Sequence, residues 1–450
     1  MLSLFDTAAG RARLVEFREP GQATMYVCGP TVYGPPHLGH GRFSLVFDIL
    51  RRYLEWTGLE VTYVSNITDI DDQIINKGEA EGRDPAEVAV EFEAKWYEGM
   101  DLIGVKRPTF DPHATAYVDQ MVQLIADLIA ADRAYETSDG VYLATEGIEG
   151  YGTLARQSLD SLRSGARIEV NDEKRSPLDF VLWKKAKPGE PTWDSPWGPG
   201  RPGWHTECVV MSLELLGEGF DIHGGGQDLA FPHHENEWAQ AKALDRAFAR
   251  HWVHNGFVEV AGEKMSKSLG NYTDLLDLAT SADPRAYRLL VLQAHYRSPV
   301  EVNRQTAAAA SAALATFDAL ARRMVGVDPG EADEAELDRF RSLMDDDMDT
   351  PAVVAQLFGL ATAANTALDG GDPASAAAAW ATIGEITRAV GIDIKAAGGE
   401  VPTEITALAA ERDEARAAKD FARADALRDE LKSLGWEVED TPEGTRVHLA

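Results

Sequence analysis

Cysteine is nearly absent from this chain of 450 residues, which contains only Cys28 and Cys208. Two cysteines cannot build a disulfide framework, and such sparse usage is typical of proteins in a reducing compartment. Residues 1–17 lack the apolar core of a signal peptide, and no apolar run approaches the roughly 18 residues that a membrane span requires. We therefore expect a cytoplasmic protein with no membrane-spanning segment, in which both thiols have a chemical role.

Positive charge is also scarce, because 43 Lys and Arg face 74 Asp and Glu, for a net charge of −31. This balance disfavours a polyanionic partner, so any nucleic acid must be held by a local basic surface. Hydrophobic residues make up 44% and charged residues 26% of the chain, which is ordinary for folded proteins. The length predicts about three domains.

Several common enzyme motifs are missing. No GxxxxGK[ST] pattern occurs, which excludes P-loop nucleotide chemistry. His234-Glu235 has Trp238 where a zinc protease needs histidine. Residues 198–203 match GxGxxG, but they contain prolines and do not open a helix after a strand, so they do not predict a dinucleotide site.

The N-terminal pattern predicts a β-α-β unit. Residues 24–28 form a short apolar strand, a helical pattern begins near Leu38, and a second strand covers 61–64. Such alternation predicts a parallel sheet, whose ligands lie at the carboxyl ends of the strands, where Cys28 is found. The fold class is therefore α/β, with further strand and helix signals at 220–223 and 234–244.

Composition divides the rest of the chain. We expect an irregular insertion, an Ala-rich helical bundle, and a last segment with one long helix over about 404–434 followed by a strand-like tail. The expected domains are the first half of the α/β domain, the insertion, the second half, the bundle and the C-terminal domain, at 1–107, 108–203, 204–303, 304–398 and 399–450.

His37-Leu38-Gly39-His40 lies at the expected helix start. Unpaired backbone N–H groups and the helix dipole favour a phosphate there, and two imidazoles three residues apart can both donate to it. Gly39 lets a base or phosphate approach the backbone. The pattern suits ATP; the alternative is a helix cap with surface histidines.

Lys264-Met265-Ser266-Lys267-Ser268 offers two ammonium groups and two hydroxyls. On a mobile loop these groups can follow a triphosphate as charge builds on departing pyrophosphate. A solvated lysine loop is the alternative.

Histidines cluster near the second cysteine. Of 11 histidines, four lie within residues 201–240: His205, His223, His233 and His234. His233 and Glu237 are four apart on a predicted helix, so they can face one point together with the two thiols. Two thiolates, one imidazole and one carboxylate suit zinc. A substrate-binding metal, a closed structural zinc and no metal at all remain open on spacing alone.

The last predicted helix carries a basic stripe, because its positive residues fall within about 60° of arc: Arg412, Arg416, Lys419 and Arg423. A solvated charged face is the alternative to RNA binding. Trp436 either stacks on a splayed base or anchors the tail.

The HLGH and KMSKS motifs together resemble the signature pair of class I aminoacyl-tRNA synthetases. Six further motifs resemble the cysteinyl-tRNA synthetase family, namely MYVCG at 25–29, NITDIDD at 66–72, GWHTEC at 203–208, HGGGQD at 223–228, FPHHENE at 231–237 and DDDMDTP at 345–351. This resemblance implies a Rossmann-like catalytic domain with an inserted subdomain, a helical bundle and a small anticodon-binding domain.

The resemblance also implies activity and site residues. The chain would ligate L-cysteine to tRNA(Cys) through cysteinyl-adenylate, as a monomer with one Zn²⁺ and with Mg²⁺ accompanying ATP. Zinc would lie on Cys28, Cys208, His233 and Glu237 and bind the substrate sulfur, which separates cysteine from serine better than an apolar pocket can. ATP would contact His37, Gly39, His40, Lys264, Ser266 and Lys267, of which the histidines and lysines would stabilise charge. Gly29, Thr68, Trp204, His205 and Asp228 would line the amino-acid pocket.

Two rival functions differ in the acceptor or in activity. The cysteine ligase of mycothiol synthesis has the same adenylation chemistry but an amino-sugar acceptor, which would need no remote docking domain. A silent zinc- and nucleotide-binding regulator would lack cysteine-dependent exchange of pyrophosphate into ATP.

Overall fold

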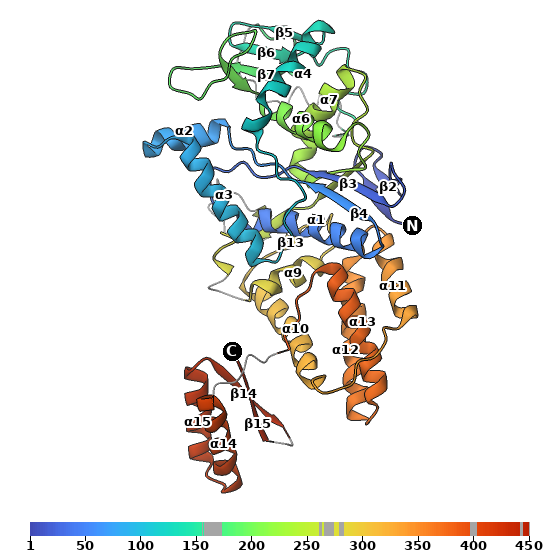
Figure 1. Ribbon diagram of the computed structural model, residues 1–450, viewed down its shortest axis with the longest axis vertical. Helices are drawn as coiled ribbons and strands as arrows, with labels where there is room; N and C mark the ends of the chain where they lie inside the picture. The colour runs from blue at the N-terminus through green and yellow to red at the C-terminus, as the bar shows by residue number, and fades with distance from the viewer. Residues whose placement is uncertain are drawn as a thin grey trace.

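A computed structural model of the chain describes residues 1–154, 156, 173–260, 263–264, 274–278, 283–396, 403–441 and 444–449. In the view of Figure 1, a layer of strands and helices crosses the middle of the molecule, the inserted segment lies above it and the helical bundle lies below it. The chain opens with an antiparallel hairpin of β1 (Ser3–Asp6) and β2 (Arg11–Leu14).

The central sheet has four parallel strands in the order β10-β9-β3-β4. Their bounds are β3 Gln22–Val27, β4 Glu60–Val64, β9 Ile222–Gly226 and β10 His251–Asn255. The predicted parallel α/β sheet is confirmed. Strand β9 begins later than the strand predicted at 220–223 and continues through the glycines that follow His223, where backbone pairing needs no side chain.

Helix α1 (Leu38–Trp56) connects β3 to β4 and packs on the sheet. A Cβ added at Gly224 of β9 would lie 2.3 Å from the Phe47 ring, so this glycine allows the helix to approach. Helices α2 (Asp72–Glu81) and α3 (Pro85–Leu102) follow β4.

The insertion is more regular than its sequence suggests. It forms an antiparallel sheet in the order β5-β6-β7-β8. The elements are η1 Ala114–Tyr117, α4 Val118–Ala130, β5 Ala134–Glu136, β6 Gly140–Leu143, β7 Phe180–Lys185 and β8 Gly200–Pro202. The expectation of irregular structure is wrong because these strands are short and pair with partners distant in sequence.

The second half of the α/β region contains further helices and short strands, three of which form a separate sheet in the order β12-β11-β13. The elements are α6 Trp204–Leu216, η2 Gln227–Leu229, η3 Ala230–His234, α7 Glu235–Ala243, β11 Val258–Val260, β12 Glu263–Lys264, α9 Pro284–Leu292 and β13 Val300–Glu301. Helix α7 confirms the predicted helix at 234–244 to within a residue at each end.

Four helices form the predicted bundle, α10 Arg304–Arg323, α11 Glu334–Asp345, α12 Thr350–Asp369 and α13 Pro373–Val390. Phe317, Leu357 and Ile383 are fully buried between them. Among the helices of the described residues, α12 is the one whose length and hydropathy would suit a membrane span. Its buried residues, including Val353 and Ala364, belong to the core of the bundle.

The C-terminal segment contains two helices rather than the single predicted one. They are α14 Thr403–Ala417 and α15 Phe421–Ser433, followed by the antiparallel strands β14 Trp436–Thr441 and β15 Gly444–Leu449. Lys419 has a φ of 59° and Asp420 caps α15 by accepting from the Arg423 N–H, so the helix ends and restarts there. Trp436 is buried with Ile405 and Leu431. Of the two roles expected for it, stacking on a base or anchoring the C-terminal tail, this burial favours the second.

This break disrupts the predicted basic stripe. Arg412 is 6% exposed and lies 2.7 Å from Asp440, and Arg416 pairs with the same carboxylate. Lys419 lies between the helices, and Arg423 bonds Glu411 at 3.1 Å. One outward basic face is therefore the wrong description, because acidic neighbours distant in sequence hold three of the four side chains.

Candidate active site

The start of α1 is built by its two histidines. His37 is the N-cap residue, and its Nδ1 accepts from the His40 backbone N–H at 3.1 Å. In return, His40 Nδ1 accepts from the His37 backbone N–H at 3.3 Å, and the two rings stack 3.6 Å apart. Because Nδ1 accepts in both rings, neutral imidazoles carry their proton on Nε2. The two interpretations of this motif, a helix cap and a phosphate-binding site, are thus compatible. Nδ1 of each ring caps the helix, and Nε2–H is the donor that can face a phosphate.

A cavity of about 370 Å³ lies where this helix start meets the carboxyl ends of the strands. It brings together seven of the residues predicted to bind ATP, amino acid or metal, namely Cys28, Gly29, His37, Gly39, His40, Trp204 and Asp228. Asn255, the last residue of β10, and Gly256, which follows it, also line the cavity and were missed because no motif marks them. The cavity lies at the sheet edge where parallel α/β folds bind ligands.

Two residues predicted for the amino-acid pocket lie behind its wall. Thr68 is 1% exposed, and its Oγ1 donates to Glu207 Oε2 at 2.9 Å. His205 Nδ1 lies 2.9 Å from His233 Nδ1. Neither side chain belongs to the lining of the cavity among the described residues.

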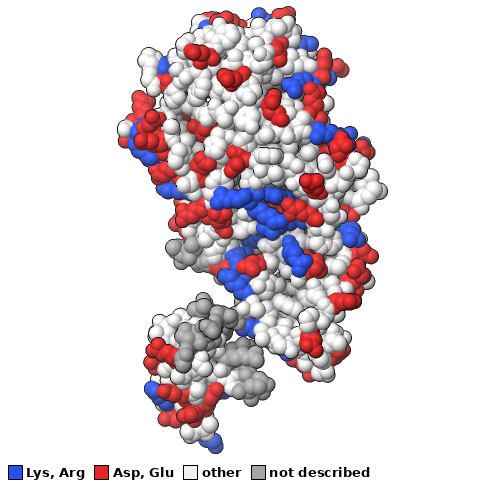
Figure 2. Space-filling view, in the orientation of Figure 1, with Lys and Arg blue, Asp and Glu red and all other residues white. Residues whose placement is uncertain are grey.

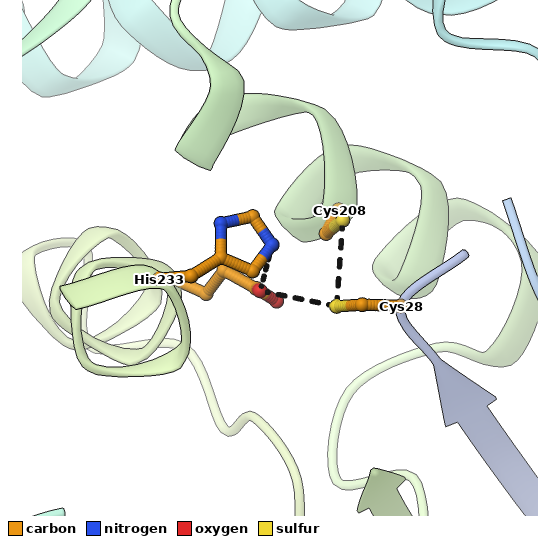
Figure 3. A group of neighbouring side chains, drawn as sticks. Cys28, Cys208 and His233 are labelled. Atoms are coloured by element: carbon orange, nitrogen blue, oxygen red, sulfur yellow. Dashed lines mark hydrogen bonds and ion pairs between the residues drawn. The ribbon is translucent and has the colours of Figure 1, made fainter. Parts of the chain in front are cut away.

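Four buried donor side chains converge beside the cavity, namely Cys28, Cys208, His233 and Glu237, whose donor atoms all lie within 4.8 Å of one another. They come from four segments: the end of β3, helix α6, the η3 turn and helix α7. Figure 3 shows Cys28, Cys208 and His233 pointing toward one common point. The predicted approach of His233 and Glu237 is found, since His233 Nε2 lies 2.9 Å from Glu237 Oε1, although His233 belongs to η3 and only Glu237 to α7.

The two distances measured from Cys28 Sγ fit a tetrahedral ion, whereas the 2.9 Å between His233 Nε2 and Glu237 Oε1 is the length of a direct contact. Cys28 Sγ lies 3.6 Å from Cys208 Sγ and 3.5 Å from Glu237 Oε1. With metal bonds of zinc length, these separations are expected at about 3.8 and 3.6 Å. His233 Nε2 is buried and lies 2.9 Å from Glu237 Oε1, so both atoms face the same point beside the two sulfurs.

Electrostatics prepares two of these four groups, Cys208 and Glu237, as ligands. Burial acts to raise the pKa of Cys208, but hydrogen bonding with the Cys28 thiol and the nearby His233 lower it to about 6. Burial likewise opposes ionisation of Glu237, yet His223 and His233 hold the pKa of that carboxyl well below its usual range. A thiolate and a carboxylate are therefore available at neutral pH. Burial raises the pKa of the Cys28 thiol, and although burial acts to lower the pKa of His233, Glu237 and Cys208 raise it to about 10, so Cys28 and His233 must each release a proton when a metal binds.

A network of histidines surrounds the cluster. The sequence indicates that His223 and His234 lie near the second cysteine but does not predict their contacts. His223 Nε2 lies 2.7 Å from Glu237 Oε2, leaving Oε1 to face Cys28 and His233. A second donor set, with His223 and His234 in place of Cys208 and His233, also lies within 4.8 Å. We favour the first set because each Glu237 oxygen then has one role: Oε1 faces Cys28 and His233, and Oε2 bonds to His223.

The network continues away from the cavity. His234 Nδ1 lies 2.8 Å from His254 Nε2, and His254 Nδ1 lies 2.7 Å from Thr7 Oγ1. Burial and the neighbouring His223 lower the pKa of His254 to about 3, so this ring is neutral at physiological pH. Nothing in the local sequence around Thr7 or His254 indicates this contact.

Most of the predicted KMSKS loop lies outside the described residues. The backbone of Lys264 pairs in β12 with β11, and its side chain, Ser266 and Lys267 are not among the described parts. The described chain resumes at Asp274, which pairs with His37, and Leu275 N–H donates to the Pro36 carbonyl at 2.8 Å. The described residues on either side of the motif thus lie close to the site, because Val258 of β11 and His37, which pairs with Asp274, both line the cavity.

Comparison with known proteins decides the family. Residues 14–312 match the model of the tRNA synthetases class I (C) catalytic domain, 339–395 match the DALR domain, and 398–448 match the cysteinyl-tRNA ligase anticodon binding domain. The chain belongs to the cysteinyl-tRNA synthetase family.

Curated relatives cover essentially the whole chain. It is 45% identical over 456 residues to the cysteine–tRNA ligase of Thioalkalivibrio sulfidiphilus, with 99% of each chain covered. It is also 45% identical over 450 residues to that of Methylobacillus flagellatus, again covering 99% of each. The chain is thus an enzyme with cysteine–tRNA ligase function.

Solved structures confirm the fold. The Mycobacterium tuberculosis methionyl-tRNA synthetase in complex with methionyl-adenylate superposes with a TM-score of 0.61 at 16% identity, covering 82% of this chain and 90% of that one. The LeuRS of Agrobacterium radiobacter gives 0.57 at 12% identity, covering 83% and 84%. The class I synthetase architecture is therefore shared.

Proposed function

We propose that this enzyme forms cysteinyl-adenylate from L-cysteine and ATP and transfers cysteine to tRNA(Cys), with one zinc ion per chain on Cys28, Cys208, His233 and Glu237. The convergence of these four buried side chains beside the cavity carries the proposal. When bound, zinc deprotonates a coordinating thiol and prefers sulfur to oxygen, which separates cysteine from serine.

The chain's own groups supply orientation and charge stabilisation. Nε2–H of His37 and of His40 donates to the phosphates, where the α1 dipole also favours negative charge. Gly39 leaves room for the nucleotide. Lys264, Ser266 and Lys267 are proposed to contact the phosphates as pyrophosphate departs, with Mg²⁺ entering as the partner of ATP.

The cavity wall also suggests how the amino acid is oriented. Asp228 is the one carboxylate among the described lining residues, so we assign it to the substrate ammonium. Trp204 and Gly29 line the same cavity and bound the space beside the Cys28 sulfur. His205 and Thr68 act from behind the wall, His205 through its contact with His233.

RNA binding by the C-terminal segment remains a proposal. The exposed side chains of Arg416, Lys419 and Arg423 are candidates for phosphate contacts, and the match of residues 398–448 to an anticodon-binding model supports this assignment. Arg412 and Trp436 are buried, so their role is to hold the segment together. We further propose that the enzyme acts as a monomer in the cytoplasm.

Substitution of one sulfur ligand tests the zinc proposal. Cys208→Ser is compared with Ser212→Ala, a buried position one turn further along α6 whose hydroxyl donates to the Val209 carbonyl. Zinc content, cysteine-dependent pyrophosphate exchange and tRNA charging are measured for both variants. We expect Cys208→Ser to lose zinc and about 100-fold in charging rate, and Ser212→Ala to keep both.

Two results would contradict the proposal. Full activity of Cys208→Ser with unchanged rejection of serine overturns the role of zinc in recognition. Absence of cysteine-dependent exchange in the unmodified enzyme overturns the adenylate mechanism.

A further inference from the structure

Three buried polar residues outside the four donor positions link the segments that carry the two cysteines. Asn66 and Thr68 follow β4 and are each 1% exposed, and Glu207 of α6 is 2% exposed. Glu207 directly precedes Cys208 in the chain, and Asn66 contacts Gly29, which directly follows Cys28. The three residues therefore connect one cysteine-bearing segment to the other.

Their hydrogen bonds form an unbroken chain. Gly29 N–H donates to Asn66 Oδ1 at 2.9 Å, and Asn66 Nδ2 donates to Thr68 Oγ1 at 3.2 Å. Thr68 Oγ1 donates in turn to Glu207 Oε2 at 2.9 Å. Asn66 Oδ1 also lies 3.7 Å from Cys208 Sγ, so the chain touches one thiol directly.

Backbone contacts hold the middle of this chain rigidly. Thr68 N–H donates to the Pro30 carbonyl at 3.0 Å, and Val32 N–H donates to the Thr68 carbonyl at 3.2 Å. The loop after Cys28 is thus tied to the loop after β4 at Gly29, Pro30 and Val32. The Thr68 hydroxyl, which gives one bond and receives one, completes the connection to α6.

We propose that Asn66, Thr68 and Glu207 are positioning residues that set the separation of the Cys28 and Cys208 sulfurs and so control how tightly the metal is held. This inference rests on the proposed zinc function. The sulfurs lie 3.6 Å apart, near the value of about 3.8 Å for two thiolates on one tetrahedral zinc. Outer partners of metal ligands commonly govern affinity in this way.

A pair of substitutions at Thr68 tests the inference without substrate. Thr68→Val keeps the volume and removes both hydrogen bonds of the hydroxyl, and Thr68→Ser keeps the hydroxyl. The full-length proteins are loaded with Co²⁺, their thiolate and d–d absorption bands are recorded, and metal release to a chelator is timed. We expect Thr68→Val to shift the bands and to release metal about 10–100-fold faster, with Thr68→Ser within threefold of the unmodified protein.

A second pair keeps the test decisive if Thr68→Val does not fold. Glu207→Gln retains an oxygen that can accept from Thr68, whereas Glu207→Ala does not, so only the alanine variant should release metal faster. Unchanged bands and release in a folded Thr68→Val, or equal release from both Glu207 variants, overturns the inference. If the unmodified protein gives no thiolate band with Co²⁺, the zinc proposal itself fails, and the inference fails with it.

Discussion

Gly29 has no room for a side chain. An added Cβ would lie 1.7 Å from the Asn66 carbonyl oxygen, which is backbone and cannot swing away. We expect Gly29→Ala to destabilise the fold by about 1–3 kcal/mol and to weaken metal retention, because Cys28 is its neighbour. Urea denaturation and zinc content measure both effects.

A glycine without such a neighbour provides the control. Gly384 lies within α13, and an added Cβ there would meet nothing within 4 Å. Gly384→Ala should stabilise the helix by about 0.5–1 kcal/mol. If Gly29→Ala proved as stable as Gly384→Ala, the close approach seen at Gly29 would not exist in solution.

His37 combines two roles that substitution can separate. Asn can replace Nδ1 as the helix cap but offers no Nε2–H, and Ala offers neither. We expect His37→Ala to lose about 0.5–2 kcal/mol of stability, whereas His37→Asn keeps it. Both should slow pyrophosphate exchange by about 10²–10³-fold if the donor acts in the transition state; normal exchange in His37→Asn would leave His37 with the capping role alone.

At the scale of elements, Arg288 joins α9 to three other segments. Its guanidinium lies 2.6 Å from the Asp48 carboxylate of α1, and it donates to the Gly104 carbonyl at 2.7 Å and the Val390 carbonyl at 3.3 Å. Arg288 is 2% exposed and Asp48 3% exposed. The helix that carries HLGH is thereby tied to the end of the bundle.

Removal of the Arg288 guanidinium leaves the Asp48 carboxylate buried without its closest positive charge. We expect Arg288→Met to destabilise the protein by about 3 kcal/mol, the lower end of the range for breaking a buried ion pair, because Arg52 still pairs with Asp48 at 2.7 Å. Arg388→Ala removes the exposed pairing with Glu385 on α13 and should change stability by less than about 1 kcal/mol. Equal urea midpoints for the two variants would contradict the structural role of Arg288.

The same pair predicts a response to acid. Burial acts to raise the pKa of Asp48, but Arg288 and Arg52 outweigh it and hold that pKa below its ordinary value. A lowered folded-state pKa gives stability that is present above the unfolded value of about 3.9 and is lost as pH falls through the folded value. Between pH 5 and about 3, Asp48→Asn should therefore lose less stability than the unmodified protein, as measured by denaturation at each pH.

At the scale of the whole molecule, charge is unevenly placed. Although the net charge is −31, Figure 2 shows a band of Lys and Arg across the middle of the face in view, at the level of α1. A local basic surface of this kind is what an acidic protein needs in order to hold RNA. The C-terminal segment, in contrast, pairs its arginines with Asp440 and Glu411.

Deletion of residues 397–450 tests whether the C-terminal segment contributes to tRNA binding and not to adenylate formation. The catalytic cavity lies entirely outside this segment, so pyrophosphate exchange should stay within about twofold, as expected for domains with separate cores. Charging of tRNA should fall by about 100-fold if the segment adds a second point of attachment. Unchanged charging at limiting tRNA would show that the segment does not bind RNA.

Much of the site was predictable because its chemistry is local. The HLGH motif, the i,i+4 spacing of His233 and Glu237, and the β-α-β alternation each depend on residues that are close in sequence. The division of the C-terminal segment into two helices was not predictable, since no glycine or proline marks the break at Lys419. The insertion sheet was also missed, because β6 and β7 pair across a long connection.

The sequence by itself determined which donor atoms are present and on which elements they lie, because periodicity and spacing fix the local backbone. Only the tertiary structure decided which of them meet. It placed Cys28 beside Cys208, set Thr68 behind the cavity wall, and buried Arg412 against Asp440. Each of these contacts joins two segments that are separated in the sequence. The distance between the two side chains depends on how strands and helices pack and not on any local sequence pattern.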